Sequence, residues 1–171
     1  MRKLLILGAG GYGKTVADVA RQLNRYEAVA FLDDHASDPD VLGKCEDFQK
    51  FSPEEWEMYP AFGNNSVRIL WLNKLRGNGV AVATLVHPSA YVSPTATLCT
   101  GVTVLPKAVV NTGVTVKAGC IVNIGALIDH DSILEEGVHL APGAIVKAEN
   151  RISAGSKIES GTVIENRQYP L

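Results

Sequence analysis

The second half of the chain repeats a hydrophobic position every six residues. From Val86 to Ile164 an aliphatic residue occupies each sixth position without a slip, fourteen times in all. An unbroken run of this length is not explained by the aliphatic content of the chain. It is typical of a β-solenoid, in which each hexapeptide forms one side of a three-sided coil. We therefore expect residues 86–171 to wind as stacked coils of about eighteen residues each.

Small residues and glycines follow the same interval. Four residues after almost every aliphatic position lies a small side chain, and Asn150 is the exception. A glycine three residues after the aliphatic position marks a turn with unusual backbone angles. The sequence thus predicts inward-pointing aliphatic stacks and tight corners. The corner glycines are Gly101, Gly113, Gly119, Gly125, Gly137, Gly143, Gly155 and Gly161.

The first half has another pattern, in which strands and helices alternate. This alternation predicts a small, mostly parallel α/β sheet, so we place the α/β domain at residues 1–85 and the solenoid at 86–171. Ser52-Pro53-Glu54-Glu55 resembles a capping box that opens a short helix. The other expected elements are strands at 3–7, 28–32 and 80–86 and helices at about 14–24 and 66–76.

Each longer helix should bury one apolar side. In the first helix this side consists of Val16, Val19, Ala20 and Leu23. In the second it consists of Val67, Leu70, Trp71 and Leu75, and the helix should stop at Gly77.

Composition and charge exclude several classes of protein. The chain has 171 residues, 46% of them hydrophobic and 20% charged, which is the composition of a folded domain. Its net charge of −2 shows no basic excess, so nucleic acid is not an expected partner. Three cysteines without a C-x-x-C pair suggest neither a disulfide framework nor a metal site, and favour the cytoplasm. The apolar run Leu4–Leu7 is too short to insert into a membrane.

A glycine-rich loop follows the first strand. A strand, a glycine turn and a helix N-terminus together expose backbone N–H groups toward an anion, and a diphosphate would fit there. Asp33 and Asp34 end the second strand, where carboxylates can accept hydrogen bonds from a ribose or a base. The alternative is a plain strand-to-helix turn, because a glycine pattern alone is weak.

Taken in order, five segments resemble the hexapeptide-repeat acetyltransferases with a left-handed parallel β-helix. The similarity is to the nucleotide-sugar and sialic acid acetyltransferase group, which includes the bacillosamine-pathway enzyme that acetylates a UDP-amino sugar. It covers nearly the whole chain. The segments are Gly8-Ala9-Gly10-Gly11-Tyr12-Gly13-Lys14, Phe31-Leu32-Asp33-Asp34, Gly63-Asn64-Asn65 with Arg68, Leu85-Val86-His87-Pro88, and Asn123 with Ile128-Asp129-His130-Asp131.

The resemblance implies a Rossmann-like first domain, a short left-handed β-helix and a homotrimer with active sites between subunits. It also implies acetyl-CoA as co-substrate, no metal, and transfer to a sugar amine or hydroxyl. By its match, His130 is the general base and Asp131 orients it. The substrate residues implied are Gly8, Gly10, Gly11, Tyr12, Gly13, Lys14, Asp33, Asp34, Asn64, Arg68 and Asn123, and the acetyl-CoA residues are His139, Gly143 and Ala148.

Three departures from the family pattern bear on the site. Tyr12 stands where many relatives have histidine. Ala148-Glu149 replaces a Gly-Asn pair common near the acyl donor. The sequence stops at Leu171, about two coils before most relatives, so we expect a shallow or altered donor site.

Other interpretations remain. His130 and His139 could be polar corner residues, Asn64, Asn65 and Arg68 could cap and solvate a helix, and Cys120 and His87 are expected to be structural. The main hypothesis is N-acetylation of a UDP-amino sugar. The alternatives are O-acetylation of sialic acid or another sugar, a non-catalytic nucleotide-sugar-binding trimer without a CoA site, and, less favoured, an NAD-dependent enzyme.

Overall fold

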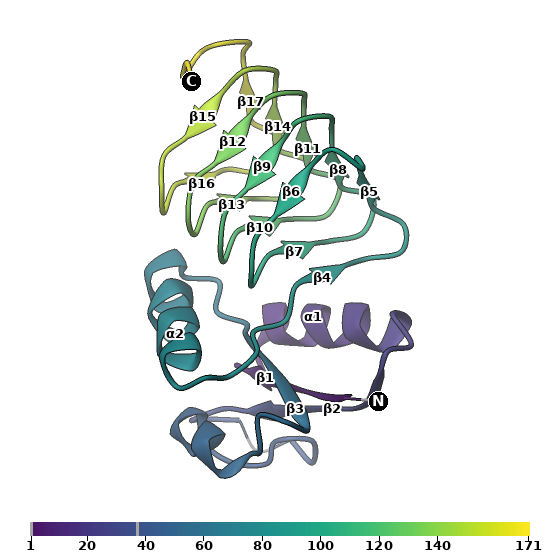
Figure 1. Cartoon of the computed structure of the whole chain (residues 1–171), viewed down its shortest axis with the longest axis vertical. Coiled ribbons are helices and arrows are strands. Elements are labelled where there is room, and N and C mark those ends of the chain that lie inside the picture. The colour runs from purple at the N-terminus through teal and green to yellow at the C-terminus, as the bar shows by residue number, and fades with distance from the viewer. Residues whose placement is uncertain (1, 37) are drawn as a thin grey trace. The chain divides into compact units, whose positions relative to one another are not determined.

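The computed structural model describes residues 2–36 and 38–171. The chain divides into two compact units, Met1–Ala83 and Thr84–Leu171 (Figure 1). Among the described residues, no helix has the length and apolarity needed to span a bilayer.

The first unit is a small α/β domain, as predicted. Its three-stranded sheet has the order β2-β1-β3, and both strand pairs are parallel. Leu4, Leu5, Ile6 and Leu7 of the central strand are fully buried. The elements are β1 (Arg2–Leu7), α1 (Gly11–Gln22), β2 (Tyr26–Leu32), the 3₁₀ helix η1 (Cys45–Lys50), β3 (Trp56–Pro60) and α2 (Asn65–Gly77).

The helix predicted from Ser52 was wrong. The Ser52 carbonyl accepts from Glu55 N at 3.2 Å and Trp56 N at 2.9 Å, which closes a turn, and β3 begins directly at Trp56. Pairing of Trp56 with Lys3 of β1 holds the chain extended, so the turn cannot propagate into a helix. Both β3 and η1 were missed by the sequence pattern.

Two further details of this unit differ from the prediction. Arg68, Leu72 and Leu75 are the buried residues of α2, whereas Val67 and Leu70 are 38% and 67% exposed. In α1, Val16, Val19 and Ala20 are buried as expected, but the helix ends before Leu23, which is half-buried.

The strand expected at 80–86 is absent as one element. Val82 makes an isolated bridge to Met58 of β3, while β4 (Leu85–Val86) pairs with a strand of the second unit. The segment therefore breaks because its two ends have different pairing partners.

The second unit is the predicted left-handed parallel β-helix. Each strand has two residues, and its second residue is the aliphatic of the six-residue interval. The strands are β4 (Leu85–Val86), β5 (Tyr91–Val92), β6 (Thr97–Leu98), β7 (Thr103–Val104), β8 (Val109–Val110), β9 (Thr115–Val116), β10 (Ile121–Val122), β11 (Leu127–Ile128), β12 (Ile133–Leu134), β13 (His139–Leu140), β14 (Ile145–Val146), β15 (Arg151–Ile152), β16 (Lys157–Ile158) and β17 (Val163–Ile164).

These strands form three parallel sheets, which we number as faces. Face 1 has the order β16-β13-β10-β7-β4, face 2 β17-β14-β11-β8-β5 and face 3 β15-β12-β9-β6 (Figure 1). Each residue pairs with the residue eighteen positions away, as Ile121 does with His139.

Three corners connect the faces. The Asn123 corner joins faces 1 and 2 and includes residues 105–108, 123–126, 141–144 and 159–162. The His130 corner joins faces 2 and 3 and includes residues 111–114, 129–132, 147–150 and 165–168. The glycine corner joins faces 3 and 1 and includes residues 99–102, 117–120, 135–138 and 153–156.

The interior follows the sequence pattern. The aliphatic positions from Val104 to Val146 have no exposed surface, and so do the small residues Ala108, Cys120 and Ala144. All eight corner glycines have φ between +64° and +73°, as their spacing predicted. Asn150, the exception in the small column, is also fully buried.

Candidate functional site

The carboxyl ends of the three strands of the first unit meet at one end of its sheet. β1 leads into Gly8, β2 into Asp33 and β3 into Ala61. Gly8 N–H donates to Leu32 O at 2.8 Å, and Ala61 N–H donates to Leu7 O at 2.8 Å. This is the usual location of a ligand site in an open parallel sheet.

The glycine loop requires glycine for two different reasons. Gly8 has φ of +102°, in a region that L side chains rarely adopt. A Cβ on Gly13 would lie 1.9 Å from Gly8 O, so Gly13 permits helix α1 to start directly against the strand. Gly10 and Gly11 are exposed, and no atom would lie within 4 Å of an added Cβ at either.

The N-terminus of α1 is open toward this loop. Gly10 is the N-cap without a side-chain cap, and the first turn carries no acidic residue. No side chain of the helix itself therefore neutralises the partial positive charge of its N-terminus, which favours an anion there.

Asp33 and Asp34 are engaged with backbone. Asp33 accepts from the N–H groups of Ala9, His35 and Ala36 at 2.8–2.9 Å, and Asp34 accepts from Cys45 N–H at 3.0 Å. Burial pushes the pKa of Asp33 up, but the three N–H groups outweigh it, so the pKa is lowered. Asp33 thus fixes the glycine loop against the turn after β2, while its role in substrate binding stays a prediction.

Tyr12, at the position of a family histidine, is paired with another tyrosine. Its hydroxyl lies 2.7 Å from that of Tyr59, and the rings meet edge to face. Tyr59 is fully buried in β3. The pair therefore connects the first turn of α1 to the neighbouring strand.

The residues after β3 mostly support the loop that they form. Asn64 is the N-cap of α2 and accepts from Val67 N–H at 3.0 Å. Arg68 is fully buried, donating to Phe62 O at 2.9 Å and Asn65 Oδ1 at 2.8 Å. A structural contribution of Asn64 and Arg68 is thus evident, while their role in substrate binding stays a prediction.

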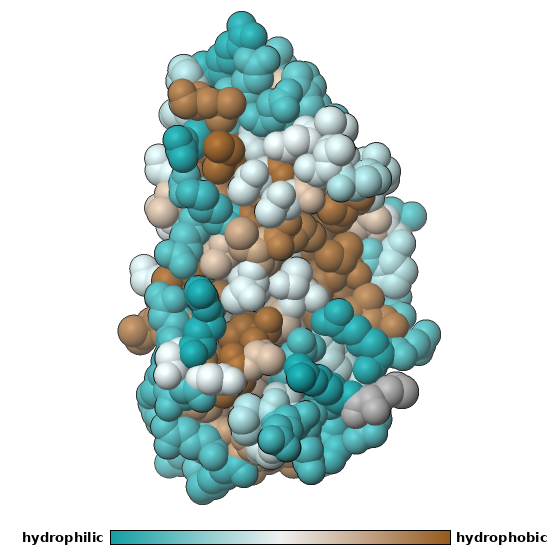
Figure 2. Space-filling model, viewed as in Figure 1, coloured by the Kyte–Doolittle hydropathy of each residue, from teal (hydrophilic) through white to brown (hydrophobic). Residues whose placement is uncertain are grey.

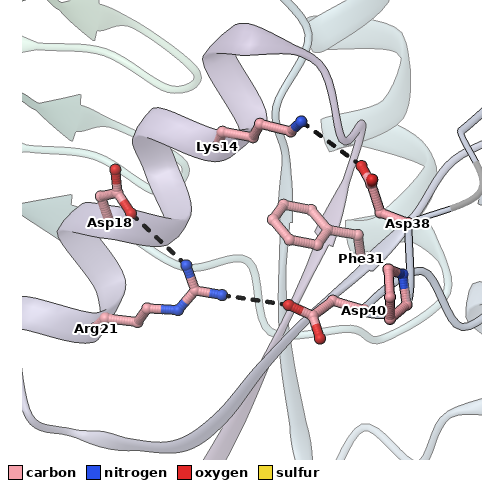
Figure 3. Close-up of a pocket in the computed structure, with 7 residues that line it drawn as sticks. Lys14, Asp18, Arg21, Phe31, Asp38 and Asp40 are labelled. Atoms are coloured by element: carbon pink, nitrogen blue, oxygen red, sulfur yellow. Dashed lines mark ion pairs between the residues drawn. The ribbon is translucent and has the colours of Figure 1, made fainter.

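Lys14 lines a cavity of about 440 Å³ beside α1 (Figure 3). The ring of Phe31 lies between the helix and the segment 38–40, and ion pairs at 3.6 Å surround it. Lys14 pairs with Asp38, and Arg21 pairs with Asp40. Arg21 also pairs with Asp18 at 3.6 Å. The cavity therefore has an aromatic wall and a rim of ion pairs in which three carboxylates face two cations.

In the second unit, His130 and Asp131 form a hydrogen-bonded pair at the corner named after His130. Nδ1 of His130 lies 2.8 Å from Oδ2 of Asp131, and the two side chains are 47% and 59% exposed. This hydrogen bond is the largest cause of a raised pKa of His130, with the charges of Asp129 and Glu149 adding to it. A carboxylate can only accept, so the neutral ring carries its proton on Nδ1 and leaves Nε2 as the acceptor.

Asp129, for which no role was predicted from the sequence, holds the backbone beneath this pair. Its Oδ1 accepts from His130 N–H at 2.7 Å and from Asn111 Nδ2 at 2.9 Å, and both bonds lower the pKa of Asp129. Asn111 precedes Asp129 by eighteen residues, one full coil. The eighteen-residue spacing between Asn111 and Asp129 is the sequence feature from which their contact could have been predicted.

The His130 corner has non-glycine residues at positive φ on three coils, whereas the Asn123 corner has one, Lys107, and the glycine corner has none. Asp131, Glu149 and Arg167 have φ of +57°, +59° and +53° at the position where Gly113 has +69°. Glu149 and Arg167 form an ion pair. His130, Ala148, Glu149, Asn166 and Arg167 line a cavity of about 360 Å³, so Ala148 lies next to His130 as one wall of the same groove.

The remaining predicted residues lie elsewhere on the solenoid. Nδ2 of Asn123 is 3.1 Å from Nε2 of His139, whose strand β13 belongs to face 1. Gly143 lies one coil above Gly125 in the Asn123 corner. His139 lies on face 1, opposite the His130 corner, and Asn123 and Gly143 lie in another corner. Within a single chain these residues are therefore apart from His130 and Ala148.

Two residues taken as structural have structural surroundings. Cys120 is fully buried, and its Sγ lies 3.0 Å from Glu135 O. His87 Nδ1 lies 2.8 Å from Ser89 Oγ in the turn that enters the solenoid. Within residues 2–36 and 38–171, no group of three or more His, Cys, Asp or Glu is placed to hold a metal ion.

The chain is similar to known proteins in sequence and in structure. Residues 3–75 match the family described as the PglD N-terminal domain. The acetyltransferase domain of PglB from Neisseria gonorrhoeae FA1090 is 37% identical, with a TM-score of 0.96, and the match covers 98% of this chain and 84% of that one. The same domain in complex with acetyl coenzyme A is 38% identical, with a TM-score of 0.95, over 97% of this chain and 83% of that one.

A more distant structure has the same fold. A mutant of perosamine N-acetyltransferase from Caulobacter crescentus, in complex with CoA and GDP-perosamine, is 23% identical with a TM-score of 0.78. The match covers 95% of this chain and 91% of that one.

Proposed function

Because the chain belongs to the sugar acetyltransferases with a left-handed β-helix, we propose that it transfers an acetyl group from acetyl-CoA to the amino group of a UDP-linked amino sugar. The main support is the His130–Asp131 pair, whose Nε2 is available as a proton acceptor in an exposed groove. Acetyl-CoA as donor is supported by the complex of the PglB domain. A nucleotide-linked acceptor is supported by the GDP-perosamine complex of the distant relative.

The proton transfer follows from the geometry of the pair. Acetyl-CoA supplies an acyl carbon activated as a thioester. The sugar amine forms the new N–C bond, the C–S bond breaks, and His130 Nε2 takes the proton that the nitrogen loses. Asp131 keeps the Nδ1–H tautomer and stabilises the imidazolium that forms. The proton on Nε2 then passes to the departing thiolate, so the transfer is balanced without a metal.

The raised pKa of His130 sets the pH dependence. Nε2 accepts a proton only when the ring is neutral, so activity should rise as the pH passes upward through the pKa of His130. Since Asp131 raises that pKa, the acid limb should lie above the pKa of an ordinary histidine.

The acceptor nucleotide is proposed to bind at the carboxyl ends of β1, β2 and β3. The N–H groups at Gly10, Gly11 and Gly13 would face the diphosphate at the open N-terminus of α1. Tyr12 takes the place of the family histidine and would offer a hydroxyl contact without handling a proton. In the reducing cytoplasm, where nucleotide sugars are available, the three free thiols would be stable.

Assembly into a homotrimer would complete the site. The outward residue of every strand on face 2 is apolar, and the set is half-buried or exposed: Tyr91, Val109, Leu127, Ile145 and Val163. Apolar side chains are visible at the protein surface in Figure 2 (brown). The outward residues of face 3 are instead Thr97, Thr115, Ile133 and Arg151. A continuous apolar stripe of this kind is typical of a surface covered by another chain.

Packing face 2 around a threefold axis would unite the two groups of predicted residues. Face 2 lies between the His130 corner and the Asn123 corner. When three such faces surround an axis, the His130 corner of one subunit adjoins the Asn123 corner of the next. His130 would then lie near the partner subunit's Asn123 and His139, which a single chain keeps apart.

The assembly can be tested by light scattering. Leu127→Lys places a charge on face 2, and Thr115→Lys places one at the equivalent outward position of face 3. We expect a trimer for the wild type and for Thr115→Lys, and dissociation with loss of turnover for Leu127→Lys. A stable wild-type monomer that retained full activity would contradict the trimer.

The function is tested by a turnover screen of acetyl-CoA with UDP-linked amino sugars and sialic acid. Release of CoA with a UDP-amino sugar is the expected result, and preference for sialic acid would establish O-acetylation instead. Calorimetric titration with acetyl-CoA covers the non-catalytic alternative, because a trimer that has lost its donor site would show no binding. NADH binding tighter than UDP-sugar binding would contradict the proposal.

A further inference from the structure

We propose that Gly113 is a positioning residue, whose missing side chain gives the Asp131 carboxylate the space it needs to contact His130. The inference rests on the proposed function, in which Asp131 orients the general base. It concerns a residue one coil away from the pair, on the neighbouring layer of the same corner.

The Asp131 carboxylate lies directly against Gly113. A Cβ built on Gly113 would be 2.5 Å from Asp131 Oδ1, well below any normal contact, and 3.5 Å from Cγ. The other oxygen of the carboxylate, Oδ2, is the one 2.8 Å from His130 Nδ1. The side chain of Asp131 therefore spans the distance between Gly113 and the imidazole.

The backbone on both layers is held, so it cannot easily yield to a larger residue. Gly113 N–H donates to Thr95 Oγ1 at 3.1 Å, and Thr95 Oγ1 in turn lies 3.0 Å from Ser93 Oγ. Asp131 N–H donates to Thr112 O at 2.9 Å. The free end of the Asp131 side chain is the part that can move, and moving it breaks the contact with His130.

The coil that precedes His130 and Asp131 thus supports both residues. Asn111 fixes Asp129, which holds His130 N–H, and Gly113 leaves room for Asp131. Both supporting residues lie eighteen positions before the residue that they support.

Positive φ alone would also explain a glycine at position 113. Another glycine of the chain, Gly155, is the control for this explanation. Gly155 has the same φ of +69°, and no atom lies within 4 Å of its added Cβ. It belongs to the glycine corner, away from His130. Gly155→Ala therefore carries the backbone strain of Gly113→Ala without the contact to a carboxylate.

The experiment compares the imidazole titration of His130 by NMR in Gly113→Ala, Gly155→Ala and Asp131→Ala, with the resonance assigned through His130→Ala. We expect Gly113→Ala to shift the titration midpoint downward, toward that of Asp131→Ala, and Gly155→Ala to leave it at the wild-type value. Adding Gly113→Ala to Asp131→Ala should produce no further shift. In turnover assays kcat should fall while KM for acetyl-CoA stays unchanged.

Asparagine variants cover the case in which alanine prevents folding. Gly113→Asn and Gly155→Asn tolerate positive φ better than alanine and still carry a Cβ. A wild-type titration in both Gly113 variants, with Asp131→Ala shifted, would overturn the inference. The proposed function fails separately: if His130→Ala kept full turnover, His130 would not be the base, while the titration would still report whether Gly113 positions Asp131.

Discussion

Two corners of the same solenoid share a turn position with positive φ but have different residue types there. At the glycine corner, every left-handed turn position is glycine: Gly101, Gly119, Gly137 and Gly155. At the His130 corner, Gly113 is followed on the next three coils by Asp131, Glu149 and Arg167. A non-glycine residue with positive φ is uncommon and carries a free-energy cost. Three successive coils therefore carry this cost at the corner where the proposed catalytic pair lies.

The interiors of the two corners differ in the same sense. Behind the glycine corner lie Val102, Cys120 and Val138, with the half-buried Ser156 on the last coil, whereas behind the His130 corner Val114 is followed by the fully buried Ser132 and Asn150. Asn150 Nδ2 donates to Lys147 O at 2.9 Å and Glu165 O at 2.8 Å, and Oδ1 accepts from Tyr169 N–H at 2.8 Å. These bonds brace the turns that contain Glu149 and Arg167. The turns with non-glycine residues at positive φ are therefore held from inside by a buried polar side chain.

The largest effect is expected from removing the imidazole. His130→Ala should lower kcat by about 10²–10⁴-fold, because that is the range for loss of a positioned general base. Glu136→Ala is the control, since Glu136 occupies the same register position at the glycine corner. It should leave turnover unchanged in an assay of CoA release. Equal losses in both variants would show that the two corners do not differ in function.

The interiors of the two corners should differ in their contribution to the free energy of unfolding. Asn150→Ala should lower the free energy of unfolding by about 2–3 kcal/mol, because buried carbonyl and N–H groups lose their partners. Ser156→Ala, the same position of the repeat at the glycine corner, should cost less than about 1 kcal/mol. Urea unfolding followed by circular dichroism measures both. A neutral Asn150→Ala would mean that the internal hydrogen bonds do not stabilise the corner.

The pH profile tests the contact between Asp131 and His130. Asp131→Asn replaces the carboxylate, whose hydrogen bond and charge raise the pKa of His130, by a neutral amide. A lower pKa means that the ring becomes neutral at lower pH, so the acid limb of kcat/KM should move to lower pH. The measurement is kcat/KM between about pH 5 and 9, the range in which histidine titrates. An unshifted acid limb would assign it to another group.

The smallest effect is expected from Glu149. Its charge is the last of the causes that raise the pKa of His130, and its carboxylate is paired with Arg167. Glu149→Gln should therefore move the acid limb in the same direction as Asp131→Asn, but by less. A shift larger than that of Asp131→Asn would show that Glu149 is the principal carboxylate acting on His130.

Long-range regularity made the solenoid predictable from the sequence. Fourteen aliphatic positions repeat one geometric requirement, so errors at single positions do not matter. The first unit offered no such redundancy. There the capping pattern at Ser52 predicts a helix, but the pairing of Trp56 with β1 keeps the chain extended. The buried side of α2 includes Arg68, which a hydrophobic pattern assigns to the exposed side.

The candidate site was predictable only in part, for a related reason. The contact between His130 and Asp131 involves neighbours in sequence, and the resemblance to a family identified it. The supports Asn111 and Gly113 lie one coil earlier, and their contacts became evident only in the stacked coils. Asp33 was expected to bind substrate, and its three backbone partners depend on the folding of the segments around it.

The sequence alone determined the hexapeptide coil, its inward aliphatic stacks and its positive-φ turns, because a repeated short-range pattern constrains every coil in the same way. The tertiary structure decided which corner has charged residues at the glycine position and which carboxylates accept from backbone N–H groups. It also decided that Asn123 and His139 contact each other away from the corner that holds His130. These relations depend on the stacking of residues eighteen positions apart and on the direction each side chain takes from a closed triangle, which a linear pattern does not specify.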